Sequence, residues 1–111
     1  MNHEKLECYR QLVSLAEEVA RRVARWPKGN RDLIDQLRRA MNSSVLNLAE
    51  GNGKRSSSAE RRRFFEISLG SIAESAAALD LAHAFGLIDA SECDSFKSRL
   101  KLAQVLIRAL P

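Results

Sequence analysis

Five basic side chains gather in the middle of the chain, directly after two glycines. Lys54 and Arg55 follow the second glycine, and Arg61, Arg62 and Arg63 come six residues later. Ammonium and guanidinium groups bind phosphate and carboxylate oxygens. If a helix begins here, its N-terminus already carries partial positive charge, and each arginine costs it roughly a few tenths of a kcal/mol. That cost favours a polyanion or an acidic protein surface as partner, although a solvated charged surface is the simpler interpretation.

The same stretch, GNGKRSS, superficially resembles the glycine loop that binds nucleotide phosphates. That loop requires a glycine five residues before the glycine that precedes lysine, and Leu48 occupies this position. It also follows a β-strand, whereas a helical pattern comes first here. We therefore do not expect nucleotide binding by this route.

No metal or cofactor is expected from the pattern of ligand-type residues. A carboxylate-bridged di-metal bundle needs a Glu-x-x-His pair on each of two helices. The chain offers one distant approximation, Asp80 with His83, while His3 lacks a partner set. Cys8 and Cys93 are too few for a disulfide framework or a zinc site, and we expect both to be buried and reduced.

Five further polar residues fall on the predicted second and third helices. Glu50 and Glu74 are a candidate pair of catalytic carboxylates. We favour instead a structural polar network, in which these carboxylates accept hydrogen bonds from Arg38, Asn47 or Ser71 and set the helix register. No Ser-His-Asp or Cys-His arrangement is suggested, so we expect no enzymatic activity.

Gly70 lies in the middle of the predicted third helix, where glycine costs about 1 kcal/mol relative to alanine. A glycine at such a place allows another backbone to approach closely. The partner backbone belongs either to a neighbouring helix of the same chain or to a second subunit, and the sequence leaves both open.

The length and composition indicate one helical domain spanning residues 1–111. Hydrophobic residues make up 45% of the 111 residues and charged residues 29%, the balance of a globular protein. No apolar run approaches the roughly 20 residues of a membrane span, and with no recognisable address we expect a cytoplasmic protein. Charge is segregated: residues 1–63 hold 14 Lys/Arg against eight Asp/Glu, and residues 64–111 hold four against six.

Apolar residues recur with helical spacing in four stretches, at about 4–25, 32–50, 57–85 and 89–110. No alternation typical of a strand occurs, so we predict an all-α, up-down four-helix bundle. The stripe expected to face the core in the third helix comprises Phe64, Ile67, Ile72, Leu79, Ala82 and Phe85. The C-terminal half of this helix is apolar or small nearly all round, which is typical of a helix surrounded by others.

Several residues mark the expected helix ends. Asn30 is a candidate N-cap for the second helix, and Gly51 is predicted to end it in the left-handed conformation. Ser57 with Glu60 has the spacing of a capping box, as has Asp89 with Glu92. Gly86 is predicted to close the third helix.

Residues 36–74, QLRRAMNSSVLNLAEGNGKRSSSAERRRFFEISLGSIAE, resemble the family of 23S ribosomal RNA intervening-sequence proteins. The matching positions are Leu37, Arg38, Ala40, Asn47, Leu48, Ala49, Glu50, Gly51, Gly53, Lys54, Ser56, Glu60, Phe64, Gly70, Ser71 and Glu74. Two positions depart from the family pattern: Val45 stands where members often have proline, and Arg61 where an aromatic or apolar residue is common.

The resemblance implies a four-helix bundle that assembles into a ring-like homopentamer. The chain is also similar to the accessory variability protein of diversity-generating retroelements, which implies a basic barrel that binds nucleic acid and associates with a reverse transcriptase. Family membership defines the fold more closely than the function.

Two functions agree with these observations. In the first, a homo-oligomer binds RNA or DNA through phosphate contacts, in a salt-dependent way. The residues expected to make those contacts are Arg38, Arg39, Lys54, Arg55, Arg61, Arg62 and Arg63. In the second, the bundle is a protein-interaction scaffold whose basic junction pairs with an acidic surface of a neighbouring subunit or partner. The six Phe, Tyr and Trp residues read mostly as core, which argues against stacking of single-stranded bases.

Overall fold

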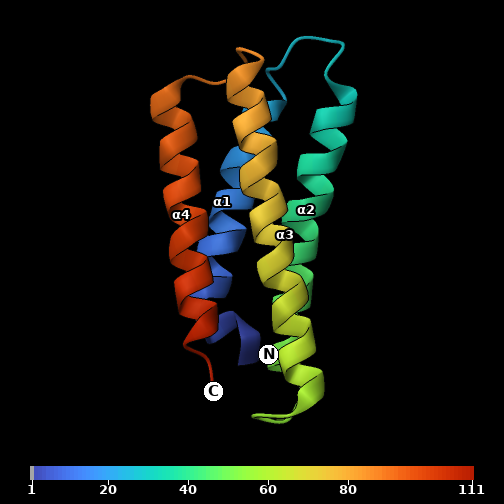
Figure 1. Cartoon of the computed structure of the whole chain (residues 1–111), viewed down its shortest axis with the longest axis vertical. Helices are drawn as coiled ribbons and strands as arrows, with labels where there is room; N and C mark the ends of the chain where they lie inside the picture. The colour runs from blue at the N-terminus through green and yellow to red at the C-terminus, as the bar shows by residue number, and fades with distance from the viewer. Residues whose placement is uncertain (1) are drawn as a thin grey trace.

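The computed structural model describes residues 2–111 as four α-helices preceded by one short 3₁₀ turn (Figure 1). The helices are α1 (Glu7–Val23), α2 (Arg31–Asn52), α3 (Ala59–Ala84) and α4 (Ala90–Arg108), and the turn is η1 (Asn2–Lys5). None of the described residues forms a β-strand. The four helices lie side by side in a body measuring 44 × 23 × 21 Å. The predicted all-α four-helix fold is confirmed.

The helices alternate in direction along the chain (Figure 1). The α2–α3 connection lies at one end of the body, and the α1–α2 and α3–α4 connections lie at the other. The core is rich in aliphatic side chains. Its fully buried large members are Leu12, Leu15, Leu37, Leu48, Ile72, Leu79, Leu100 and Ile107. Burial of each contributes roughly 1.5–3 kcal/mol. Within residues 2–111, no helix is long and apolar enough to cross a membrane.

Serine side chains line the contact between α2 and α3, the most extensive helix pairing of the fold. Ser44, Ser68 and Ser75 are fully buried. The Ser68 hydroxyl donates to the Ser44 carbonyl oxygen at 2.7 Å, and the Ser44 hydroxyl donates to the Met41 carbonyl oxygen at 2.7 Å. Small side chains let the two backbones approach closely, and their hydroxyls are satisfied by backbone oxygens.

These serine pairs define the register of α2 against α3. Ser44 bonds to Ser68, and Ser43 bonds to Ser71 one step further along. The helices are antiparallel, so the level of a residue depends on its distance from the α2–α3 connection. A step back along α2 is matched by an equal step forward along α3. Arg39 therefore lies at the level of Glu74.

The ends of α2 and α3 differ from the sequence prediction. Gly51 lies inside α2 rather than in a left-handed cap, and the helix ends at Asn52 with Gly53 as a right-handed C-cap at φ −78°. A Cβ at Gly51 would lie 2.7 Å from the Phe65 ring, so this glycine is required by close packing rather than by chain reversal. The N-cap of α3 is Ser58, whose hydroxyl accepts from the Arg61 N–H at 3.1 Å, not Ser57.

The remaining helix ends agree more closely with the prediction. The Asp89 side chain accepts from the Glu92 N–H at 2.7 Å and caps α4. Gly86 closes α3 with φ 77°, in a Schellman arrangement. Asn30 occupies the N-cap position of α2, but its side-chain amide donates to the Pro27 carbonyl oxygen at 2.8 Å instead of capping the helix. Helix α1 begins at Glu7, later than predicted.

The predicted core stripe of α3 is wrong at three positions. Ile67 and Phe85 face outward, with 38% and 61% of their surface exposed, and Phe64 is only half-buried. Phe65 is buried in place of its neighbour. Apolar residues occur around the whole of α3, so periodicity alone does not show which side faces the core. The close contact with α2 buries the side of α3 that carries serines. The predicted members that are buried are Ile72, Leu79 and Ala82.

Gly70 lies on the outer face of α3. Apart from its two chain neighbours and the adjacent backbone of α3 itself, no atom of the described chain lies within 4 Å of the position that its Cβ would take. The explanation by close packing within the chain is therefore wrong, and the alternative of a subunit contact stays a prediction.

Candidate nucleic-acid interface at the α2–α3 junction

The connection between α2 and α3 is a tight loop at one end of the body (Figure 1). The Lys54 N–H donates to the Gly51 carbonyl oxygen at 3.1 Å, and the Ser58 N–H donates to the Arg55 carbonyl oxygen at 3.1 Å. Ser57 has φ 61°, a left-handed conformation that non-glycine residues rarely adopt. These turns fold the loop back on itself and leave the Arg55 side chain exposed.

Arg61 is buried at this junction, with 7% of its surface exposed. Its guanidinium donates to the carbonyl oxygens of Gly51 and Asn52 at 3.2 and 3.3 Å, and to the Pro111 backbone oxygen at 2.7 Å. It also lies 4.6 Å from the centre of the Phe65 ring. The last carbonyls of a helix carry partial negative charge and lack intrahelical partners. Arg61 therefore closes the C-terminal end of α2.

The prediction that Arg61 contacts phosphate is thus corrected, because its donors are engaged inside the protein. A sequence signal for this existed: Arg61 stands where an aromatic or apolar residue is common in the pattern that the chain resembles. A position that usually holds such a residue faces inward, and the long apolar stem of arginine fits that position if its head finds acceptors.

Three arginines and one lysine remain at the surface of the junction. Lys54 pairs with Glu60 at 3.1 Å, and this hydrogen bond raises the pKa of the Lys54 ammonium above its ordinary value. Arg62 is exposed and donates to the Ser57 carbonyl oxygen at 2.6 Å. Arg55 and Arg63 are exposed and form no hydrogen bond or ion pair with any described residue. We name Lys54, Arg55, Arg62 and Arg63 the basic tip.

Arg38 and Arg39 are exposed but lie away from the basic tip. They are separated from the C-terminal end of α2 by more than ten residues, which is roughly 20 Å along a helix at 1.5 Å per residue. Being consecutive, they also point about 100° apart around the helix axis. The structure therefore joins four of the seven predicted phosphate-contacting residues and separates these two from them.

The predicted polar network is present in part and is built around a residue that sequence analysis missed. The Asn47 side-chain amide donates to the backbone oxygen and the hydroxyl of Ser43 at 2.9 and 3.1 Å. The Ser71 hydroxyl donates to the same Ser43 hydroxyl at 2.7 Å. The consecutive serines at 43 and 44 were the signal, because small hydroxyl side chains on a helix face permit close packing and bonding to the neighbouring helix.

Arg38, Glu50 and Glu74 lie outside this network. All three are exposed, and none forms a hydrogen bond or ion pair within the described chain. The register places Glu74 level with Arg39, eleven residues or roughly 17 Å from Glu50. Carboxylates so far apart cannot act on one reacting atom, so the structure does not form the candidate catalytic pair.

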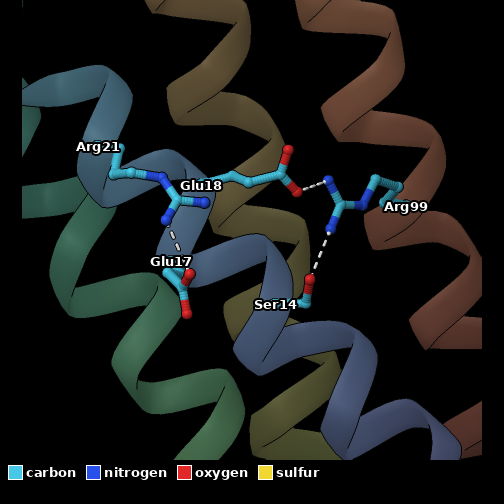
Figure 2. Close-up of polar contacts among 5 residues, drawn as sticks. All are labelled: Ser14, Glu17, Glu18, Arg21 and Arg99. Carbon is cyan, nitrogen blue, oxygen red and sulfur yellow. Dashed lines mark hydrogen bonds and ion pairs between the residues drawn. The ribbon is translucent and has the colours of Figure 1, made fainter.

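All three arginines of α1 and Arg99 of α4 form ion pairs, two of which are drawn in Figure 2. Arg99 of α4 reaches across to pair with Glu18, and it also donates to the Ser14 hydroxyl at 3.3 Å. Arg21 pairs with Glu17 at 2.8 Å. The other two arginines of α1 are also paired, Arg10 with Glu7 and Arg22 with Glu92. The unneutralised arginines of the basic tip therefore contrast with those of α1.

The sequence of the chain matches a known protein family. A family model described as 23S rRNA-intervening sequence protein matches residues 4–109, which is nearly the whole chain. No curated protein is significantly similar to the chain.

Proposed function

Because the chain belongs to the 23S rRNA-intervening sequence protein family, we propose that it is a non-enzymatic helical bundle that binds nucleic acid through the basic tip. The observation that carries this proposal is the pair of exposed arginines, Arg55 and Arg63, which lack partners within residues 2–111. Exposed arginine side chains without internal partners are free to take phosphate oxygens.

The chemistry expected at the basic tip is contact with the phosphate backbone. Guanidinium groups bind phosphate oxygens through two parallel hydrogen bonds. The N-terminus of α3 adds free backbone N–H groups and partial positive charge at the same place. If Arg55, Arg62 and Arg63 each contact one phosphate, log affinity plotted against log salt concentration should have a slope of about −2 to −3.

Fluorescence polarisation of labelled RNA and DNA, titrated with salt, tests this proposal. We expect Arg55→Ala/Arg62→Ala/Arg63→Ala to weaken binding and flatten the salt slope, with the fold retained. The matched control removes the same charge from the opposite end of the body, as Arg21→Ala/Arg25→Ala/Arg31→Ala. Absence of binding at low salt, or affinity that does not change with salt, would contradict the proposal.

A second candidate function is a protein-interaction scaffold, favoured by the outer face of α3. Ile67, Leu81 and Phe85 expose 38%, 45% and 61% of their surface there, and Gly70 is open to solvent. We propose that further copies of the chain cover this face, since exposed apolar residues along one helix are typical of an assembly surface. The family resemblance implies five copies, arranged as a pentamer.

Light scattering separates the two functions. Under the scaffold function, charge pairing between copies makes the triple arginine variant dissociate, while under the nucleic-acid function the same variant keeps its mass and loses binding. Leu81→Glu/Phe85→Glu is expected to dissociate the assembly in either case. A monomeric protein at micromolar concentration would contradict the oligomeric part of both.

A further inference from the structure

A surface hollow of about 470 Å³ lies beside the basic tip. It is lined by His3 of η1, by Leu46, Asn47, Ala49 and Glu50 of α2, and by Phe64 of α3, and we name it the Phe64 pocket. The hollow is open and shallow, so it would hold a ligand against its wall rather than enclose it. The phosphate contacts proposed above make no use of it.

Two of the three polar residues that line the Phe64 pocket, Asn47 and Glu50, present hydrogen-bond acceptors, and the third is the His3 imidazole. The Asn47 amide nitrogen donates to the Ser43 carbonyl oxygen, which can only accept, and this orients the amide. The Asn47 amide oxygen is left as an acceptor. The Glu50 carboxylate forms no hydrogen bond or ion pair with any residue that the structure describes. A ligand held by Asn47 and Glu50 must therefore present N–H donors, and the carboxylate repels a phosphate.

Apart from these three polar residues, the lining of the pocket is apolar and includes the Phe64 ring. Leu46 exposes 67% of its surface, and Phe64 is half-buried at the edge of the hollow. The Lys54 ammonium lies 5.5 Å from the centre of the Phe64 ring. This contact joins the pocket to the basic tip, so a phosphate at the tip and a flat ring in the pocket are within the reach of one nucleotide.

We propose that the Phe64 pocket binds one unpaired base of the nucleic acid held at the basic tip, and that it prefers guanine; this rests on the proposed function. Guanine presents two adjacent donors, N1–H and the N2 amine, on its Watson–Crick edge, which match the two oxygens of the Glu50 carboxylate. Uracil, cytosine and adenine lack that pair. Bases of single strands are recognised in this way, by stacking on an aromatic side chain and hydrogen bonding of the Watson–Crick edge.

Phe64 is an exception to the expectation from sequence that the aromatic residues belong mostly to the core. Phe64 and Phe65 are adjacent, and only Phe65 is taken by the core. The side chain that packing leaves at the surface lies next to the cations.

The test uses four labelled ten-residue oligouridines, unchanged or with one central G, A or C, measured by fluorescence polarisation. We expect the G-containing strand to bind roughly tenfold more tightly than the others, the lower part of the range for a bidentate base contact. Glu50→Gln should remove this preference and leave the salt slope unchanged. Phe64→Leu should weaken all four strands by at least about fivefold.

The matched control is Glu74→Gln, which changes an exposed carboxylate eleven residues further along the register. This variant should alter neither base preference nor affinity. Circular dichroism verifies that each variant is folded, and Glu50→Gln, an exposed isosteric change, tests the base contact without disturbing the core.

The possible results separate failure of the base pocket from failure of the proposed function. No binding by the unchanged protein overturns the proposed function together with the base pocket. Equal binding of the four strands, with Glu50→Gln silent and the triple arginine variant weakened, overturns the base pocket alone. A change of oligomeric mass in Phe64→Leu without any effect on binding shows that the pocket is a subunit contact, which also overturns it.

Discussion

The guanidinium of Arg61 lies 4.6 Å from the centre of the Phe65 ring, inside the junction between α2 and α3. The Phe65 ring also packs against Gly51, which has no Cβ and so leaves room for the ring. The cation, the ring and the glycine thus form one packed unit at the end of α2. The exposed arginines that we propose as phosphate ligands belong to the same junction and lie next to these packed residues.

Gly51→Ala should destabilise the protein by about 1–3 kcal/mol, although alanine is the better helix former. A new methyl group would lie 2.7 Å from two Phe65 ring carbons, and overpacking of this kind costs more than helix propensity returns. Urea denaturation followed by circular dichroism measures the change. Gly53→Ala is the control: its φ of −78° suits alanine and its methyl group would meet no atom closer than 3.5 Å, so it should stabilise by up to about 1 kcal/mol. Equal effects would contradict the packing explanation.

Arg61→Met should destabilise the protein by about 2–4 kcal/mol, because four backbone oxygens at the junction lose their charged donor. Arg61→Lys should recover only part of this loss, since an ammonium cannot reproduce the planar fork. Arg62→Ala should change stability by less than about 0.5 kcal/mol, as expected for an exposed position. The measurement is again urea denaturation, and an Arg61→Met protein as stable as the Arg62→Ala variant would show that Arg61 is not a structural residue.

Ser68→Leu should destabilise the protein by more than about 2 kcal/mol, and Ile67→Ser should cost little by comparison. Sequence hydrophobicity predicts the opposite order. Ser68 is fully buried against the α2 backbone, where a larger side chain forces the helices apart, while Ile67 exposes 38% of its surface. Thermal unfolding of both variants is the check, and it should be read with the oligomeric mass, since Ile67 lies on the proposed assembly face.

Cys8 and Cys93 should react slowly with a disulfide reagent at pH 8 and rapidly after unfolding. Both thiols are buried, as predicted, and burial raises the pKa of each above its ordinary value. A thiol with a raised pKa keeps its proton in the folded protein at a pH where the unfolded chain already loses it. The free energy of unfolding is therefore unaffected below the unfolded-state pKa of about 8.5, and it falls as pH rises from there through the folded-state value. Stability should therefore decline in the alkaline range, and less steeply in Cys8→Ala. Immediate reaction of both thiols in native buffer would contradict their burial.

Local patterns were sufficient to predict the four helices and several of their ends. Helical periodicity and the caps at Asp89 and Gly86 depend on residues a few positions apart, so the chain carries this information without reference to its fold. The basic character of the junction was visible for the same reason. These features, together with the family motif, led to the four-helix bundle.

Only the tertiary structure decided which side of α3 faces the core. Its apolar residues occur all round, and the choice was made by the close approach of α2, which needs serines at 44 and 68 opposite each other. The same packing turned Arg61 inward, left Phe64 at the surface, and placed Glu50 and Glu74 at different levels. Each of these outcomes depends on contacts between residues ten or more positions apart, for which spacing along a single helix carries no signal.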